Sequence, residues 1–139
     1  NNDKAKEYLN TAYTKGILES SYYLAKIAMD EGDYKGALEL FEKYAEDKGR
    51  VTLSGWYDGM ADCLMKEEKY EEALTYVTKG LALEDISAMK QLMQKKVVLN
   101  EKLTDYNKAY EAALEYGKLY PEDKEMAREI IFLSTRKSK

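Results

Sequence analysis

The sequence contains no histidine, one cysteine and one proline among its 139 residues. Without histidine the chain cannot form Cys/His zinc sites or Ser–His and Cys–His nucleophile systems, and one cysteine cannot form an internal disulfide. Because proline is scarce, few positions force a helix to end, and the composition favours a helical chain. No apolar run approaches the roughly 20 residues that span a bilayer, so we expect no transmembrane helix.

Charged residues are abundant, but their distribution excludes two further classes of function. The chain has 26 acidic and 22 basic residues, a net charge of −4 and an isoelectric point near 5.1. Nucleic-acid binding requires a clustered basic surface, and the nearest basic run is the short stretch 136–139. Neighbouring carboxylates such as Glu71 and Glu72 point in different directions on a helix, so they do not converge as an acid–base pair. The sequence therefore predicts no nucleic-acid binding, no enzyme activity and no cofactor.

One stretch of sequence recurs three times at a constant spacing. The copies are EGDYKGALELFEKY (31–44), EEKYEEALTYVTKG (67–80) and LTDYNKAYEAALEY (103–116). Their shared residues are 36 positions apart in each case: Tyr34, Tyr70 and Tyr106, and likewise Ala37, Ala73 and Ala109. A fixed period of about 20 to 50 residues is the signature of a solenoid. Since the tyrosine and the alanine share one helix face, we expect the alanines to be buried at helix crossings.

Each period holds two helical patterns with a short joint between them. The joints are GD at 32–33, EK at 68–69 and TD at 104–105. Joints of this length make the two helices antiparallel neighbours. Asp33 and Asp105 can cap the helix that follows, whereas Lys69 cannot. We expect eight helices, at about 2–15, 18–30, 34–48, 52–66, 70–83, 87–102, 106–119 and 122–136.

The pattern resembles the tetratricopeptide repeat over roughly residues 3–136. The elements that carry the resemblance are the large–small pairs Leu24–Ala25 and Met60–Ala61, the Ala-x₃-aromatic element Ala37–Phe41, and the closing Pro121. In the third unit Lys96–Val97 replaces the large–small pair. The resemblance implies an all-α fold, a right-handed α-solenoid of antiparallel helix pairs with about eight helices.

The resemblance also implies one domain over residues 1–139, which starts half-way through a unit. Its expected parts are a half repeat at 1–16, repeats at about 18–50, 52–86 and 87–121, a terminal helix at 122–136 and a basic tail at 137–139. In the register of a fourth unit, Ala127, Ile130 and Ile131 would face the third repeat.

In the resembled family, the first helix of each unit lines a concave groove that holds an extended peptide. The groove positions carried over to this chain are Tyr22, Tyr23, Lys26, Asp58, Gly59, Asp62, Gln94, Lys95 and Val98. The alternative is that these residues only pack or lie scattered on the surface. Family members that grip a free C-terminal carboxylate use Lys and Asn where this chain has Tyr22 and Asp58, so that clamp is missing. Asp58 and Asp62 instead favour a neutral or basic ligand.

The stretch EIIFL (129–133) spreads four consecutive apolar residues around the last helix, although a terminal helix should be polar outside. Phe132 would close the end of the groove as a further ligand-binding residue, or contact another molecule in a homodimer through this helix. Alternatively, the basic tail 136–139 folds back over it with its aliphatic stems. Cys63 is expected to be a buried small hydrophobe.

These observations predict a non-catalytic scaffold that binds a protein or extended peptide in its concave groove. The alternative is a structural or self-association module of a longer or membrane-tethered protein. An enzyme would need a dry, deep pocket that holds a carboxylate pair with shifted pKa values. The sequence leaves open whether the chain is cytoplasmic or belongs to an extracytoplasmic tethered lipoprotein.

Overall fold

The computed structural model describes residues 2–17 and 19–138, and this part of the chain forms eight α-helices. They are α1 (Asn2–Thr14), α2 (Glu19–Asp30), α3 (Tyr34–Lys48), α4 (Ser54–Lys66), α5 (Tyr70–Leu81), α6 (Met89–Lys102), α7 (Tyr106–Leu119) and α8 (Lys124–Arg136). The eight expected helices are confirmed, although α4, α6 and α8 each begin two residues later than expected. Three residues used in the expected boundaries, Asn1, Leu18 and Lys139, lie outside the described residues. None of the described helices is long and apolar enough to cross a membrane.

The three short joints share one backbone geometry, which explains their constant length. Gly32, Glu68 and Thr104, each 36 positions after the last, adopt positive φ angles of 83°, 59° and 59°. The next residue in each joint donates its N–H to a carbonyl five positions back, at 2.8 to 2.9 Å. This is a Schellman turn, which satisfies the free carbonyls at the end of a helix. The same turn therefore folds each helix pair back on itself.

Side-chain caps fix where the second helices and α8 begin. Asp33 and Asp105 accept hydrogen bonds from the N–H groups of residues 36 and 108, at 2.9 and 3.1 Å. Lys69 makes no such bond, as expected. Asp123 accepts from the Met126 N–H at 3.0 Å, so α8 starts after this aspartate, and Pro121 lies in the turn before it. The expected start of the last helix at 122 was therefore too early.

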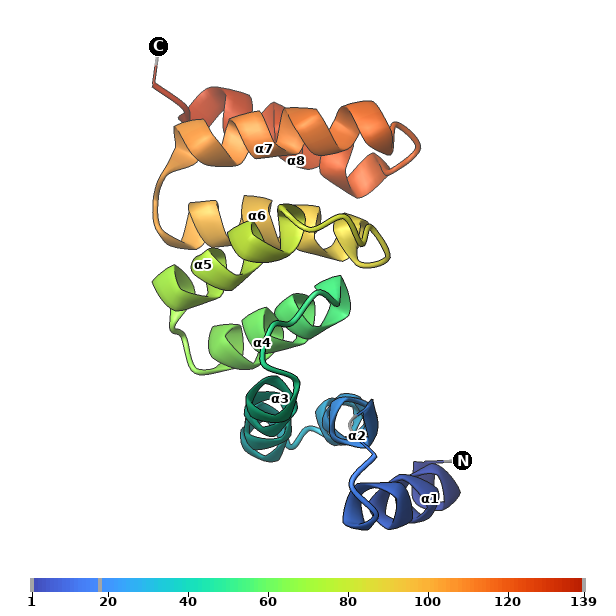
Figure 1. Cartoon of the computed structure of the whole chain (residues 1–139). Helices are drawn as coiled ribbons and strands as arrows, with labels where there is room; N and C mark the ends of the chain where they lie inside the picture. The colour runs from blue at the N-terminus through green and yellow to red at the C-terminus, as the bar shows by residue number, and fades with distance from the viewer. Residues whose placement is uncertain (1, 18, 139) are drawn as a thin grey trace.

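The helices stack in chain order from α1 to α8, and the direction of the helices turns along the stack (Figure 1). Each helix packs against the next. The first helices of successive units also touch one another, α2 with α4 and α4 with α6. Ala37, Ala73 and Ala109 are all 0% exposed, which confirms the expected burial at helix crossings. The core is divided into three clusters along the stack, as expected when each unit buries its apolar face against its neighbours.

The loop between α5 and α6 caps the start of α4. Leu53, the residue before α4, offers no side-chain cap. Instead the Asp85 carboxylate, in the loop before α6, accepts from the Ser54 N–H at 2.8 Å and from the Ser54 hydroxyl at 3.0 Å. Backbone hydrogen bonds from Ser87 and Ser54 lower the pKa of Asp85 to about 2. This carboxylate therefore ties the start of α4 to the loop that leads into α6.

The buried face of α8 differs from the expected one at Ile131. Met126 and Leu133 are buried and Ile130 packs beside them, at the i, i+4, i+7 spacing of one helix face. Ile131 is 68% exposed, so its expected contact with the third repeat was wrong, whereas Ala127, though exposed, borders α7. The period of 36 residues carries Ala25, Ala61 and Val97 onto Leu133, and all four are at most 1% exposed, so α8 keeps the register of the earlier first helices.

Candidate functional site

The two tyrosines expected in the groove have different environments. Tyr22 is buried, and its ring lies 6.0 Å from Phe41 and 5.8 Å from Tyr44, so it is part of the core. Tyr23 is 53% exposed and packs edge-on against Tyr22 at 5.1 Å. Gly59 is also a packing residue, because a Cβ there would lie 2.4 Å from the Phe41 ring. Of these three candidates, only Tyr23 offers a large surface to a ligand.

Lys95 joins both aspartates that were expected to attract a basic ligand. Its Nζ lies 2.7 Å from Asp58 Oδ1 and 3.1 Å from Asp62 Oδ1, which links α6 to α4. The side chains of Asp58 and Lys95 are only 9% and 15% exposed, and that of Asp62 is 34% exposed. Burial opposes the charge of Lys95, but Asp58 and Asp62 together outweigh it and raise its pKa. The residues expected in the middle of the groove thus form an internal ion cluster, in which the chain supplies its own cation.

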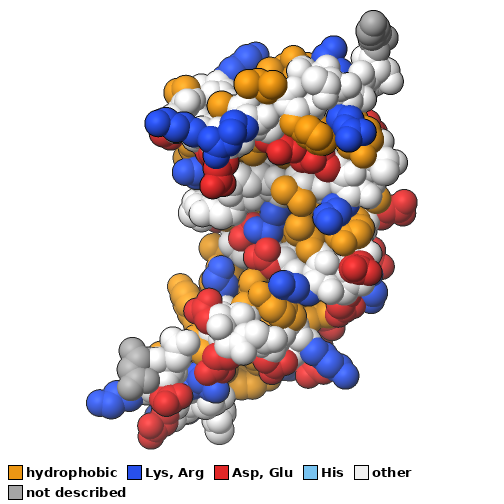
Figure 2. All heavy atoms as spheres, turned by 180° about the vertical axis from the view of Figure 1, so that it is seen from behind, with side chains coloured by type: hydrophobic (Ala, Val, Ile, Leu, Met, Phe, Trp, Pro, Cys, Tyr) orange, Lys and Arg blue, Asp and Glu red, His pale blue; other side chains and the backbone are white. Residues whose placement is uncertain are grey.

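Asp62 is the more open member of this cluster. Burial raises its pKa, and the neighbouring charge of Asp58 adds to the effect. Lys95 and, more weakly, Lys26 of α2 act in the opposite direction. Lys26, Asp62 and Lys95 therefore form a row of charges across three consecutive first helices. On the face opposite to that of Figure 1, acidic and basic side chains lie next to one another over the middle of the molecule (Figure 2).

Gln94 is held by an internal hydrogen-bond chain. Its side-chain amide donates to the Tyr116 hydroxyl at 2.9 Å, and that hydroxyl donates to Asp123 Oδ2 at 2.6 Å. Burial and the bond to Asp123 raise the pKa of Tyr116 to about 12. Three elements, α6, α7 and the turn before α8, are thereby fixed to one another. These bonds hold Gln94 at the edge of the space between α6 and α8.

Phe132 is 43% exposed, and the C-terminal residues fold back beside it. The Arg136 guanidinium carbon lies 5.2 Å from the Phe132 ring centroid, and Lys137 Nζ lies 5.2 Å from that of Tyr110. The Ser138 N–H donates to the Asn107 side chain at 2.7 Å. Arg136 is the last residue of α8, so its cation lies over the Phe132 ring as an i, i+4 neighbour on the same helix. The tail residues Lys137 and Ser138 lie against α7. The expected roles of Phe132 in the groove or in a homodimer stay predictions.

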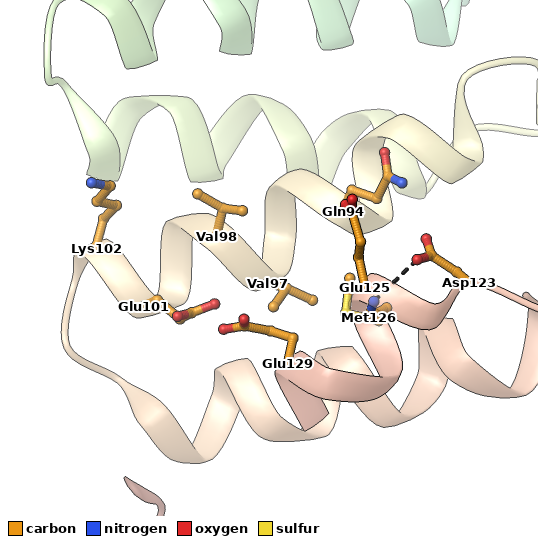
Figure 3. A pocket seen from close by; sticks show the side chains of 9 residues that line it. All are labelled: Gln94, Val97, Val98, Glu101, Lys102, Asp123, Glu125, Met126 and Glu129. Carbon is orange, nitrogen blue, oxygen red and sulfur yellow. Dashed lines mark hydrogen bonds between the residues drawn. The ribbon is translucent and has the colours of Figure 1, made fainter. Parts of the chain in front are cut away.

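A cleft of about 510 Å³ lies between α6 and α8 (Figure 3). Its lining residues are Gln94, Val97, Val98, Glu101, Lys102, Asp123, Glu125, Met126 and Glu129. Glu101 and Glu129 point toward each other from the two helices (Figure 3). Burial, then a hydrogen bond with Glu129 and its negative charge, raise the pKa of Glu101 to about 7, against the opposing effect of Lys102. Glu101 is therefore partly protonated at neutral pH.

No group of three or more metal-ligating side chains occurs in the described ranges 2–17 and 19–138. Cys63 is completely buried, which confirms the expected small core residue. Burial raises the pKa of the Cys63 thiol to about 12.

We expect Cys63 to resist alkylation in the native protein at pH 8, because the reactive form of a cysteine is the thiolate. Iodoacetamide labelling followed by mass spectrometry should show little modification until urea unfolds the chain. Rapid labelling of the folded protein at pH 8 would contradict both the burial and the raised pKa.

Comparison with known proteins gives one match to a family model. Residues 28–95 match the sequence model of the tetratricopeptide repeat. Two solved structures of a protein named MamA are similar to this chain. The first aligns with a TM-score of 0.75 and 17% identity, and the alignment covers 90% of this chain and 81% of the MamA chain. The second aligns with a TM-score of 0.78 and 16% identity, and the alignment covers 97% of this chain and 81% of the MamA chain. At such identities the likeness shows the fold alone, and no curated protein sequence gives a significant match.

The tetratricopeptide register predicts that the first helices line a groove, but it missed the two glutamates of the cleft. Glu101 lies in the last turn of α6, and Glu129 lies near the middle of α8, so they do not occupy equivalent repeat positions. Their approach depends on the rotation of α8, which the Tyr116–Asp123 hydrogen bond helps to set. The repeat pattern contains no signal for this contact.

Proposed function

We propose that the chain is a non-catalytic scaffold that holds an extended segment of another protein against its first helices. The observation that carries the proposal is the continuity of this surface. The charge row of Lys26, Asp62 and Lys95 joins α2, α4 and α6, and the cleft joins α6 to α8. Side chains that are already fixed in the free protein lose little conformational entropy on binding.

Exposed apolar groups along the same surface would supply contact area. Tyr23 at the α2 end is half exposed, and Val98 borders the cleft at the α6 end with 40% of its surface exposed. Aromatic and aliphatic anchors of this kind carry much of the binding energy in peptide complexes. A ligand would therefore lie across consecutive first helices, with polar contacts in the middle.

The paired carboxyl groups do not by themselves favour catalysis. Acid–base chemistry is strongest in a site that excludes water. Both Glu101 and Glu129 keep part of their surface in contact with solvent. The described residues also include no metal-binding group that would activate a substrate beside them. We therefore propose a binding role for the cleft.

The test is to select binding peptides from a library of random peptides displayed on phage. The affinity of the selected peptides is then measured for variants of this chain. We expect selected peptides to lose at least about tenfold in affinity with Val98→Arg, which places a long charged side chain in the groove. The matched control is Leu114→Arg on α7, because Leu114 is 38% exposed and does not line the cleft. Peptides that respond to Leu114→Arg and not to Val98→Arg would overturn the groove assignment.

Self-association is a second candidate, favoured by the apolar surface of α8. Ile131 is the more exposed of two adjacent apolar residues there, and Arg136 lies over the other, Phe132. A second molecule that covered Ile131 would remove apolar area from water. Sedimentation of the parent and of Ile131→Glu distinguishes the two candidates. If the unmodified chain stays monomeric at high concentration, self-association is contradicted.

A further inference from the structure

The cleft between α6 and α8 contains more negative than positive charge. Four carboxylates line it, namely Glu101, Asp123, Glu125 and Glu129, whereas Lys102 is the one cation among its described lining residues. Lys102 Nζ lies 5.9 Å from the Tyr70 ring centroid, so this cation is engaged outside the carboxylate pair. In the described part of the chain, no charged group of α5 or α7 lines the cleft. Asp123 is engaged by the Tyr116 hydroxyl and the Met126 N–H, but no cation of the described residues forms an ion pair with Glu101, Glu125 or Glu129.

The previous pair of first helices shows how the same fold satisfies two carboxylates. Between α4 and α6, the ammonium of Lys95 contacts both Asp58 and Asp62, at 2.7 and 3.1 Å. Between α6 and α8, Glu101 and Glu129 face each other without such an ammonium (Figure 3). Asp58 and Asp62 share one helix whereas Glu101 and Glu129 lie on two, but only the two aspartates have an ammonium group of the described chain between them.

We propose that this cleft binds a lysine side chain of the partner segment, with its ammonium group between Glu101 and Glu129. Val97, Val98 and Met126 form the apolar part of the lining and would contact the aliphatic stem of the lysine. The volume of about 510 Å³ is ample for one side chain. This inference rests on the proposed function, because it assigns one ligand group to the end of the proposed groove.

Lysine binding and proton binding compete in this cleft. The free pair retains a proton with a pKa of about 7 at Glu101. An ammonium group between the two carboxyl groups favours both carboxylates in the ionised form, so that proton leaves on binding. Affinity should therefore rise with pH and level off above about 7. For a single linked proton, binding at pH 6 should be about tenfold weaker than at pH 8.

The probe is lysine amide acetylated on its α-nitrogen, so that the side-chain ammonium group is free. It is added to the ¹³C-labelled chain while the side-chain carboxyl signals are followed by NMR. We expect the signals of Glu101 and Glu129 to shift saturably at pH 8, with about tenfold weaker binding at pH 6. N-acetyl-norleucine amide, which lacks the ammonium, should leave both signals unchanged. N-acetyl-arginine amide is a further arm, and stronger binding of arginine than of lysine would overturn the assignment of the ligand.

Glu129→Gln should weaken lysine binding at pH 8 by about tenfold, because it removes one of the two charged acceptors. Glu122→Gln is the matched control, since Glu122 is exposed beside α8 and does not line the cleft. Absence of a saturable shift in the parent at pH 8, or equal affinity at both pH values, would overturn the inference. If the affinity of the selected library peptides still falls with Val98→Arg, the proposed function is supported even though the lysine assignment is wrong.

Discussion

Lys95→Met should lower the free energy of unfolding by about 3–5 kcal/mol at pH 7, the largest single effect expected in this chain. Asp58 and Lys95 are both nearly buried, and the bridge between them is 2.7 Å long. Methionine preserves the aliphatic stem but leaves Asp58 as an uncompensated buried charge. Urea denaturation followed by circular dichroism measures the loss.

Two controls separate the lost charge pair from a general packing defect. Adding Asp58→Asn to Lys95→Met removes the unpaired charge, so the double variant should be more stable than the single variant at pH 7. Lys118→Met on α7 alters an exposed lysine, and should change stability by no more than about 0.5 kcal/mol. A double variant that is less stable than Lys95→Met would show that the bridge is not the cause.

Ala73→Leu should destabilise the chain by about 1–3 kcal/mol through overpacking. Ala73 is fully buried, in the cluster that also contains Ala61, Val77 and Leu92. It lies in the middle unit, where helices on both sides prevent the added carbon atoms from finding free space. The denaturation midpoint should fall without a change in slope, because the surface exposed on unfolding stays nearly the same.

Thr75→Leu is the matched control for this substitution. Thr75 lies on the same helix, two residues further on, and is exposed. The change adds a leucine at a position with free space, so stability should stay within about 0.5 kcal/mol of the parent. If both leucine variants melted like the parent, the crossing would be looser than the buried alanine implies.

The repeat architecture could be predicted from the sequence because its determinants are local and recur. A tyrosine and an alanine on one helix face recur every 36 residues, and the same turn closes each helix pair. The aspartate caps Asp33 and Asp105 act within three residues of their own position. Each of these features can be recognised in a single unit. Three copies then make the assignment secure, since independent units agree.

The charged part of the candidate site could not be predicted in the same way. Lys95 was assigned to the groove as a residue free to meet a ligand, but it contacts carboxylates that belong to the unit before. Helical periodicity places a residue on a face, but it does not specify which neighbour that residue meets across two helices. The same limit explains Glu101 and Glu129, whose contact depends on how α8 is rotated. For Tyr22, helical spacing did not separate a buried ring from an exposed one.

The division of the core into three clusters has a consequence for the response of the chain to mechanical force. No residue of α1 is buried, and an exposed bridge of 2.9 Å between Lys6 and Glu31 helps to hold it against α2. Stretched between its two ends, the molecule should release α1 at low force, because few contacts must break together. The α4–α6 region, held by Lys95 and by the Asp85 cap, should extend last. Tension applied at the N-terminus would then be absorbed by α1 before it distorts the cleft between α6 and α8.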